Sequence, residues 1–275
     1  MQLSAYLDRI GFSGTPRPDL ASLKALHRAH HLAVPYDALD VQLEREVSTD
    51  PAHAYRKIVE QRRGGWCYEM NGVFGWALGE IGFDVTRVAA GANKEVGGEL
   101  LLGNHLILLV RLPESLYLAD VGFGDGPVEP YPIVEGPFSQ NGFHFALERP
   151  EGDWWRLRNR QGGGAKSFDF KLDGADEALM AGRCEWLRFS PESAFVLNAV
   201  VQRHTPEGYL LLRGRTLITV TPQGETSRLL ADADEYVGVL RETFGLDLPE
   251  AASLWPRICA RHEQVMAERL EKAEA

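Results

Sequence analysis

Cysteine is scarce in this sequence, and the few cysteines form no pattern. The 275 residues include three cysteines, which lie far apart and form no Cys-x-x-Cys pair: Cys67, Cys184 and Cys259. An odd number of scattered cysteines argues against a disulfide framework and against a zinc site. We therefore expect no bound metal and a reducing, cytoplasmic setting, in which each cysteine is either buried or reactive.

Positive charge and long apolar runs are also in short supply. The 29 lysines and arginines are outnumbered by 39 aspartates and glutamates, which gives a formal net charge of −10. This balance argues against nucleic acid and anionic membranes as main partners, because both bind basic surfaces. No apolar run approaches the length of a membrane span. The opening MQLSAYLDRIGF lacks the basic and apolar regions of a signal peptide, so we expect it to belong to the mature domain.

Apolar residues at helical spacing predict a helical region over residues 1 to about 85. Asp50-Pro51 indicates a helix start within it. A later helix is expected at 67–81, where the apolar positions follow the rhythm of one helix face and Gly82 provides a C-cap.

The period then changes to that of strands, and residues 86 to about 185 are expected to form mainly a sheet or barrel. The last part mixes strands with helices, and the glycines at 162–164 indicate a surface loop. The expected strands are 84–88, 105–112, 117–121, 143–148, 154–158, 167–172, 194–203, 209–217, 219–221 and 227–229. The expected C-terminal helices are 232–244 and 254–271.

Cys67 stands at the first turn of the predicted 67–81 helix, directly after RRGGW. Unpaired N–H groups and the helix dipole favour a thiolate there, and so does a nearby arginine. The pair Gly64-Gly65 allows a tight backbone turn before it. A buried, unreactive cysteine is the alternative, but the flanking residues favour a nucleophile.

A thiolate nucleophile needs a base that later serves as an acid, and histidine does this near neutral pH. His105 opens a strongly apolar predicted strand, where a polar residue needs either a function or a structural partner. Three other histidines lie in a polar helical stretch, where surface or capping roles are expected: His27, His30 and His31. The remaining four have no evident companion: His53, His144, His204 and His262.

Asp120 is the candidate for orienting the His105 ring. The two residues are equidistant from a turn centred near residues 112–113, so an antiparallel hairpin would place them opposite each other, about 5 Å apart. A register shift of two residues would leave them diagonal, and a shift of one would separate them. An unpaired buried carboxylate is costly. The sequence therefore predicts a nucleophile, base and orienting acid in Cys67, His105 and Asp120.

The loop after Asp120, residues 121–126 with the sequence VGFGDG, lets backbone amides approach a ligand. It lacks the lysine and the serine or threonine of a P-loop. A plain β-turn is one interpretation of this loop, and a pocket wall beside the triad is the other.

These residues resemble a known family. RGGWCYEMN at residues 63–71 is similar to the R-G-G-x-C-x-E-x-N signature of the arylamine N-acetyltransferases. His105 and the run DVGFG at 120–124 resemble the other two triad positions of that family. Residues 26–39, 205–217 and 232–246 are similar to its P-F-E-N-L segment, third domain and C-terminal helix, so the resemblance covers nearly the whole chain.

The resemblance implies an α+β fold with three domains and a triad like that of cysteine proteases. A helical bundle (1–85) would carry Cys67, a β-barrel (86–190) would carry His105 and Asp120, and an α/β lid (191–275) would complete the fold.

It also implies acetyl transfer from acetyl-CoA, as co-substrate, to an aromatic amine, a hydrazine or an N-hydroxyarylamine. Cys67 would carry the acetyl group as a thioester, which gives ping-pong kinetics. His105 would pair with Cys67 and relay protons, and Asp120 would hold its tautomer. Phe123 would line the acceptor pocket, Gly124 would lie where donor and acceptor meet, and Thr216 would contact the coenzyme.

The sequence departs from the family pattern at two places. P-F-E-N-L is replaced by PYDAL at 35–39, where Asp37 keeps the acid and Ala38 loses the hydrogen bonds of asparagine. We expect Asp37 to pair with Arg63 instead of lying on a helix surface. Gly103-Asn104 stands where many members have Gln-Thr. These changes leave the triad intact and bear on acceptor and donor preference.

Three other functions remain open. A polyketide amide synthase would use the same triad and take its acyl group from a carrier protein. A cysteine hydrolase or a transglutaminase-like enzyme is a second alternative. The same triad would then deliver the acyl group to another acceptor, which for a hydrolase is water. A binding module with a decayed site is the non-enzymatic alternative, and the intact triad argues against it.

Overall fold

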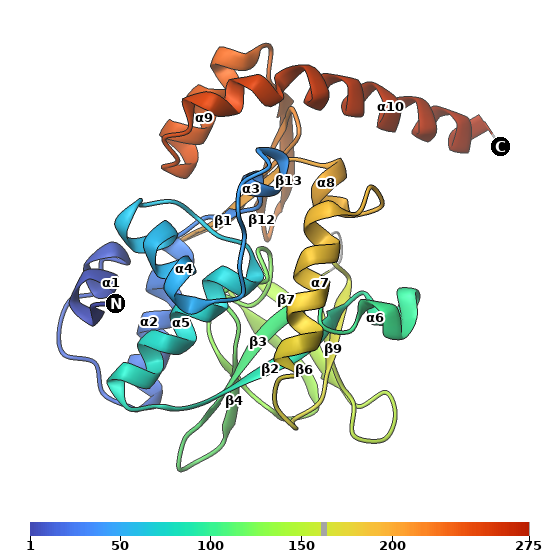
Figure 1. Cartoon of the computed structure of the whole chain (residues 1–275). Coiled ribbons are helices and arrows are strands. Elements are labelled where there is room, and N and C mark those ends of the chain that lie inside the picture. Colours follow the sequence, from blue (N-terminus) through green and yellow to red (C-terminus); the bar gives the residue numbers. More distant parts are fainter. Residues whose placement is uncertain (161–163, 275) are drawn as a thin grey trace.

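The computed structural model describes residues 1–160 and 164–274 (Figure 1). Gly162 and Gly163 of the predicted surface loop lie outside the described residues. Helices of the N-terminal part form one side of the molecule, an eight-stranded sheet lies beside them, and a five-stranded sheet with two C-terminal helices lies at one end. No helix in the described part of the chain is both long enough and apolar enough to cross a membrane.

The N-terminal part is helical, as predicted. Its helices are α1 (Leu3–Arg9), α2 (Leu20–Ala33), α3 (Leu39–Gln42), α4 (Pro51–Tyr55), the π-helix η1 (Arg56–Glu60) and α5 (Cys67–Ile81). The Asp50 side chain caps α4 by accepting from the Ala52 N–H. Gly82 ends α5 at φ 102°, a left-handed conformation that glycine adopts without strain. One short strand, β1 (Tyr36–Asp37), leaves this part and joins the C-terminal sheet.

The eight-stranded sheet is antiparallel and has the order β5-β4-β3-β2-β9-β8-β7-β6. Its strands are β2 (Asp84–Ala92), β3 (His105–Arg111), β4 (Leu116–Ala119), β5 (Tyr131–Pro132), β6 (Gly136–Gln140), β7 (Phe143–Glu148), β8 (Trp155–Arg158) and β9 (Ser167–Phe170). The short α6 (Lys94–Gly97) and η2 (Gly98–Leu101) connect β2 to β3. The predicted strands of this region are confirmed, and β5 and β6 were missed.

Helix α7 (Glu177–Phe189) follows the sheet and was also missed. It packs Met180, Cys184 and Leu187 against the core of the N-terminal helices. Only these three positions are buried, and Trp186 and Phe189 of the same helix are exposed, so apolar residues do not mark a single face of this helix. The Asp176 side chain caps its first turn by accepting from the Leu179 N–H.

The five-stranded sheet has the order β1-β10-β11-β12-β13, with β10 (Val200–Thr205), β11 (Gly208–Arg213), β12 (Thr216–Thr221) and β13 (Gly224–Leu229). It is followed by α9 (Ala233–Phe244), η3 (Pro249–Leu254) and α10 (Trp255–Glu274), close to the predicted helices. Two predicted strands were wrong. Residues 194–197 form the helix α8 (Ala194–Leu197), which the Ser193 hydroxyl caps. The strand expected at 209–217 is divided by a turn at Gly214, where φ is 55°.

Strand β3 lies between two hydrophobic cores and brings His105 to their junction. Residues 106, 108 and 110 pack beneath α5, whereas Ile107 and Leu109 point into the core of the eight-stranded sheet. Burial on both faces explains why the sequence of this strand is an unbroken apolar run. His105 shares the face of Ile107, because side chains alternate along a strand.

Candidate active site

Cys67 is the first residue of α5, so it lies beside the unpaired N–H groups of the helix start. Its side chain is almost fully buried, and Sγ lies 3.8 Å from the carbonyl oxygen of Asn104. At Gly64 an added Cβ would come within 2.2 Å of the Pro35 oxygen. Close packing of β1 against the motif therefore explains this glycine, rather than the tight turn that we expected.

His105 and Asp120 meet in the structure. Nε2 of the imidazole lies 2.7 Å from Oδ2 of the carboxylate, and both side chains are buried. The predicted hairpin register was wrong by two residues, because Arg111 pairs with Leu116 and not with residue 114. Asp120 is therefore diagonal to His105 instead of opposite. The contact survives because a shift of two residues keeps both side chains on one face.

The surroundings of the His105 imidazole favour its protonated form. Burial by itself lowers its pKa, but the Asp120 carboxylate outweighs burial and raises the pKa to about 10. A hydrogen bond to Cys67 and the charge of that sulfur act in the same direction. Since Asp120 occupies Nε2, Nδ1 is the ring nitrogen left to face the sulfur. This arrangement can hold a thiolate and an imidazolium side by side.

Asn71 connects the Cys67 helix to Asp120. Its Nδ2 donates to Oδ1 of Asp120 at 2.7 Å and to the Leu106 carbonyl at 2.6 Å, and its Oδ1 accepts from the Val121 N–H at 2.9 Å. The side chain is fully buried, and every bond fixes the orienting acid relative to α5 and β3. Sequence analysis gave this residue no role. The available signal was its spacing, four residues after Cys67, which places both on one helix face.

Behind the nucleophile lies a buried group of alternating charges. Nη2 of Arg63 donates to Asp37 and to Asp40, each at 2.8 Å, which confirms the predicted Asp37–Arg63 pair. Nζ of Lys57 lies 2.7 Å from both Asp40 and Glu69. Each buried charge is thus next to an opposite one, which offsets the cost of removing it from water. The pairs bind β1 and η1 to the helix that carries Cys67.

Glu69 supports the start of that helix. Its Oε2 accepts from the Trp66 N–H at 3.2 Å, which satisfies one of the free donors before the first turn. Burial raises the pKa of Glu69 to about 7, although the Lys57 charge acts in the opposite direction. The acid of the RGGWCYEMN motif therefore holds the backbone that presents Cys67.

Phe123 lies beside the triad candidates, and the next residue, Gly124, lies against β10. The Phe123 ring is 5.2 Å from the His105 ring, and Phe168 of β9 is 5.2 Å from the same ring and 4.9 Å from Phe123. At Gly124 an added Cβ would overlap Oε1 of Gln202 at 1.7 Å, so a larger residue there would displace the Gln202 side chain of β10. The imidazole thus packs against two tilted aromatic rings. Phe168 was not identified from the sequence.

Comparison with known proteins places this geometry in a family. Residues 19–253 match a family model described as N-acetyltransferase. The arylamine N-acetyltransferase of Mycolicibacterium smegmatis is 32% identical over 92% of this chain and 94% of its own. The chain belongs to the arylamine N-acetyltransferase family. The resemblance and the α+β fold predicted from the sequence are thereby confirmed.

Other members of the family agree with this assignment. The arylamine N-acetyltransferase of Escherichia coli strain K12 is 32% identical over 90% of each chain. A solved structure of the Mycobacterium marinum arylamine N-acetyltransferase in complex with CoA has a TM-score of 0.84. It is 28% identical and covers 94% of this chain and 98% of its own.

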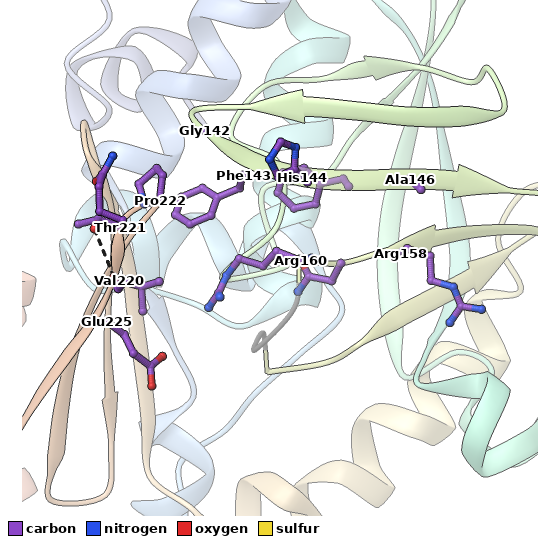
Figure 2. A pocket seen from close by; sticks show the side chains of 14 residues that line it. Gly142, Phe143, His144, Ala146, Arg158, Arg160, Val220, Thr221, Pro222 and Glu225 are labelled. Atoms are coloured by element: carbon purple, nitrogen blue, oxygen red, sulfur yellow. Dashed lines mark hydrogen bonds between the residues drawn. The ribbon is translucent and has the colours of Figure 1, made fainter.

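A cleft of about 750 Å³ opens between β7 and the β12–β13 hairpin (Figure 2). Phe143, Arg158 and Arg160 lie on one side of it, and the hairpin supplies the opposite wall. Asn159 also lines the cleft, and its Nδ2 donates to Oδ1 of Asp125 at 3.0 Å. The cleft is therefore linked to the glycine loop that follows the triad aspartate.

Thr216 lies apart from the triad candidates. It begins β12, which β10 and β11 separate from β1 in the five-stranded sheet, and it pairs with Arg213 and Leu229. The other end of its strand, at Thr221, lines the cleft. Of the predicted site residues, the structure brings together Cys67, His105, Asp120 and Phe123. Gly124 lies against Gln202 of β10, and Thr216 lies apart.

The surface roles expected for the histidines of α2 were wrong. His27, His30 and His31 are all buried, with exposed fractions of 2% or less. Burial lowers the pKa of each one. His204, for which we expected no companion, packs edge-on against His31, with the ring centroids 4.3 Å apart. These polar residues form the inward face of α2, against α5 and β10.

Proposed function

We propose that this protein transfers the acetyl group of acetyl-CoA to the nitrogen of an aromatic amine, a hydrazine or an N-hydroxyarylamine, through a thioester on Cys67. The contact that best supports this proposal is the 2.7 Å bond from His105 to Asp120, with the other ring nitrogen turned to Cys67. Family membership supports the donor and the class of acceptor. The division into 1–85, 86–190 and 191–275 and the cytoplasmic location belong to the same proposal.

In the first half-reaction the Cys67 thiolate attacks the thioester carbonyl of acetyl-CoA. A bond forms between Sγ and the acetyl carbon, and the bond from that carbon to the CoA sulfur breaks. The departing CoA thiolate takes the proton from Nδ1 of the His105 imidazolium and leaves as the thiol. Cys67 contributes to the raised pKa of His105. Once the sulfur is acetylated that contribution is lost, so the ring releases its proton more readily.

In the second half-reaction the amine attacks the Cys67 thioester. The now neutral His105 removes a proton from the attacking nitrogen, an amide bond forms, and the bond from Sγ to the acetyl carbon breaks. The thiolate and the imidazolium are thereby restored. CoA leaves before the amine reacts, so the kinetics are ping-pong.

Binding of the two substrates follows from the surroundings of the triad. Phe123 offers an aromatic surface to an aryl ring beside His105, and the fully buried Phe168 packs against Phe123. We place the phosphates of CoA in the cleft near β7, where Arg158, which also pairs with Glu95 and Glu148, and Arg160 supply positive charge. The link from this cleft to Asp125 leads toward Gly124. Thr216 stays a proposed coenzyme contact, in the strand whose other end lines this cleft.

The experiment is to measure the intact mass of the pure protein after it is mixed with acetyl-CoA alone, map the modified peptide, and repeat after an arylamine is added. We expect one acetyl group on Cys67, which leaves as the acetylated amine appears. The Cys67→Ala variant should gain no acetyl group and should have no transfer activity.

Two other results would contradict the proposal. A Cys67 that reacts quickly with iodoacetamide but takes no acetyl group would indicate a different acyl donor, as in an amide synthase. Loss of the acetyl group to water at the same rate with and without amine would indicate a hydrolase.

A further inference from the structure

His27 of α2 touches both ends of the segment that carries the triad aspartate. Its Nε2 accepts from the Asp120 N–H at 3.1 Å, and its Nδ1 donates to the Val128 carbonyl oxygen at 2.9 Å. The side chain is 1% exposed. A backbone N–H can only donate and a carbonyl can only accept, so these partners fix one neutral tautomer, with the hydrogen on Nδ1.

The surroundings of His27 keep that tautomer neutral. Burial lowers its pKa to about 4, although the Val128 carbonyl and the charges of Asp120 and Glu129 act in the opposite direction. The His31 ring lies 4.8 Å away and is neutral for the same reason. Protonation of His27 would place a second donor against the Asp120 N–H and break the contact.

Both ends of the segment 120–128 lie outside the strands. The ladder between β3 and β4 ends at Ala119, so the Asp120 N–H has no strand partner, and β5 begins only at Tyr131. His27 supplies the partner at each end. Between these ends lie Phe123 and Gly124, so a side chain of α2 fixes both the orienting acid and the pocket wall.

We propose that His27 is a positioning residue for the acetyl transfer: it holds the main chain of Asp120 so that the carboxylate meets His105, and it holds the glycine loop closed at Val128. It touches neither substrate nor the reacting atoms. The proposal rests on the function proposed above, because it gives His27 a role only through the pair that activates Cys67.

His30 provides a matched control on the same helix. It is fully buried, its ring lies 5.6 Å from the Phe74 ring, and that of His27 lies 5.7 Å from the same ring. Its hydrogen-bond partner is the Tyr6 hydroxyl and not the 120–128 segment. Replacing either histidine with phenylalanine removes a buried polar ring, but only the change at position 27 removes the contact with Asp120.

The test is the rate of Cys67 alkylation by iodoacetamide as a function of pH, with peptide mapping, in the wild type, His27→Phe and His30→Phe. We expect alkylation of His27→Phe at pH 7 to fall about tenfold, with its pH midpoint moved upward. This is less than the ~10⁴-fold loss of kcat when the orienting acid of a serine protease triad is replaced. His30→Phe should keep the wild-type pH profile, whatever its thermal stability. A His27→Phe profile that overlays the wild type would overturn the proposal.

Two further variants keep the test decisive if His27→Phe does not fold. Glutamine at position 27 places an amide near the position of Nε2 and can still accept from the Asp120 N–H, whereas asparagine reaches only to the position of Nδ1. We expect the wild-type pH profile for His27→Gln and a shifted one for His27→Asn. Equal profiles for both would contradict the role of the Asp120 contact. A wild-type Cys67 no more reactive at pH 7 than an ordinary thiol would instead contradict the function proposed above.

Discussion

Asp120 is flanked by two buried histidines that come from different parts of the fold. On the side of β3, His105 contacts the carboxylate, and its pKa is raised to about 10 despite burial. On the side of α2, His27 contacts the backbone N–H of the same residue, and burial lowers its pKa to about 4. Their exposed fractions are 3% and 1%, so the degree of burial does not explain the difference.

The difference shows what a buried imidazole needs in order to hold a proton. Burial penalises the charged ring at both positions, but a full negative charge 2.7 Å away outweighs that penalty and a backbone dipole does not. The β3 side therefore has a proton that can move during a reaction. The α2 side has a fixed tautomer, which suits a role in positioning.

The largest expected effect comes from removing the charge on the β3 side alone. Asp120→Asn keeps the backbone N–H that His27 accepts from, but it removes the carboxylate that holds the His105 proton. We expect acetyl transfer to fall about 10³- to 10⁴-fold, in line with the same change in serine proteases. Steady-state assays with acetyl-CoA and an arylamine measure this, and circular dichroism checks that the fold is kept. Transfer within a few-fold of wild type would remove Asp120 from the triad.

The same variant tests the pKa difference through stability. His105 binds its proton more tightly in the folded state than in the unfolded state, so its stabilising effect is complete below pH 6.5 and is lost as pH rises toward 10. The difference in unfolding free energy between wild type and Asp120→Asn should therefore shrink from pH 6 to pH 10. The shrinkage should be on the order of 3–5 kcal/mol, and urea unfolding at several pH values measures it. A constant difference across this range would mean that His105 is not charged.

A smaller effect is expected at the third contact of Asp120. Asn71→Ala removes the bond to Oδ1 but leaves both histidines in place, so the carboxylate can rotate without losing its charge. We expect transfer to fall about 10- to 100-fold, the cost of slight misplacement, with the pH profile kept. Asn198→Ala is the control, because that half-buried side-chain amide bonds to the Ala194 carbonyl and to no other described residue. Equal rates for the two variants would show that Asn71 does not position the acid.

The triad candidates were predictable because each residue differs in type from the residues around it in the sequence. Cys67 follows a glycine pair at a helix start, and His105 and Asp120 interrupt apolar strands, where polar residues need partners. Their exact pairing was not predictable. The turn falls one residue later than symmetry suggests, and turn geometry, not strand composition, sets the register.

The positioning residues were hidden for a different reason. His27 lies in a stretch of polar residue types, and only the packing of α2 against α5 and β10 turns that face inward. Asn71 was hidden for a similar reason. The role of a buried asparagine shows only in its hydrogen-bond partners, and two of these partners, Leu106 and Val121, are far from Asn71 in the sequence. Helix α7 was missed because only three of its positions are buried.

The smallest expected effect lies on the α2 side, at a histidine that does not touch Asp120. His204 packs edge-on against His31, and burial lowers the pKa of His204 to about 3. Its Nε2 makes no hydrogen bond to the described residues. His204→Phe should therefore change the unfolding free energy at pH 7 by less than about 1 kcal/mol, because an unsatisfied buried polar atom is replaced by carbon.

The effect of His204 on stability should appear in acid. The folded state resists protonation of His204, so the unfolding free energy of the wild type falls as pH falls from 6.5 toward 3. At pH 4.5 the variant should have a larger unfolding free energy than the wild type, while its transfer rate is unchanged. Denaturant unfolding of both proteins at pH 7 and pH 4.5 measures this difference. If the variant is no more resistant than wild type at pH 4.5, the neutral state that we assign to the α2 side is wrong at this position.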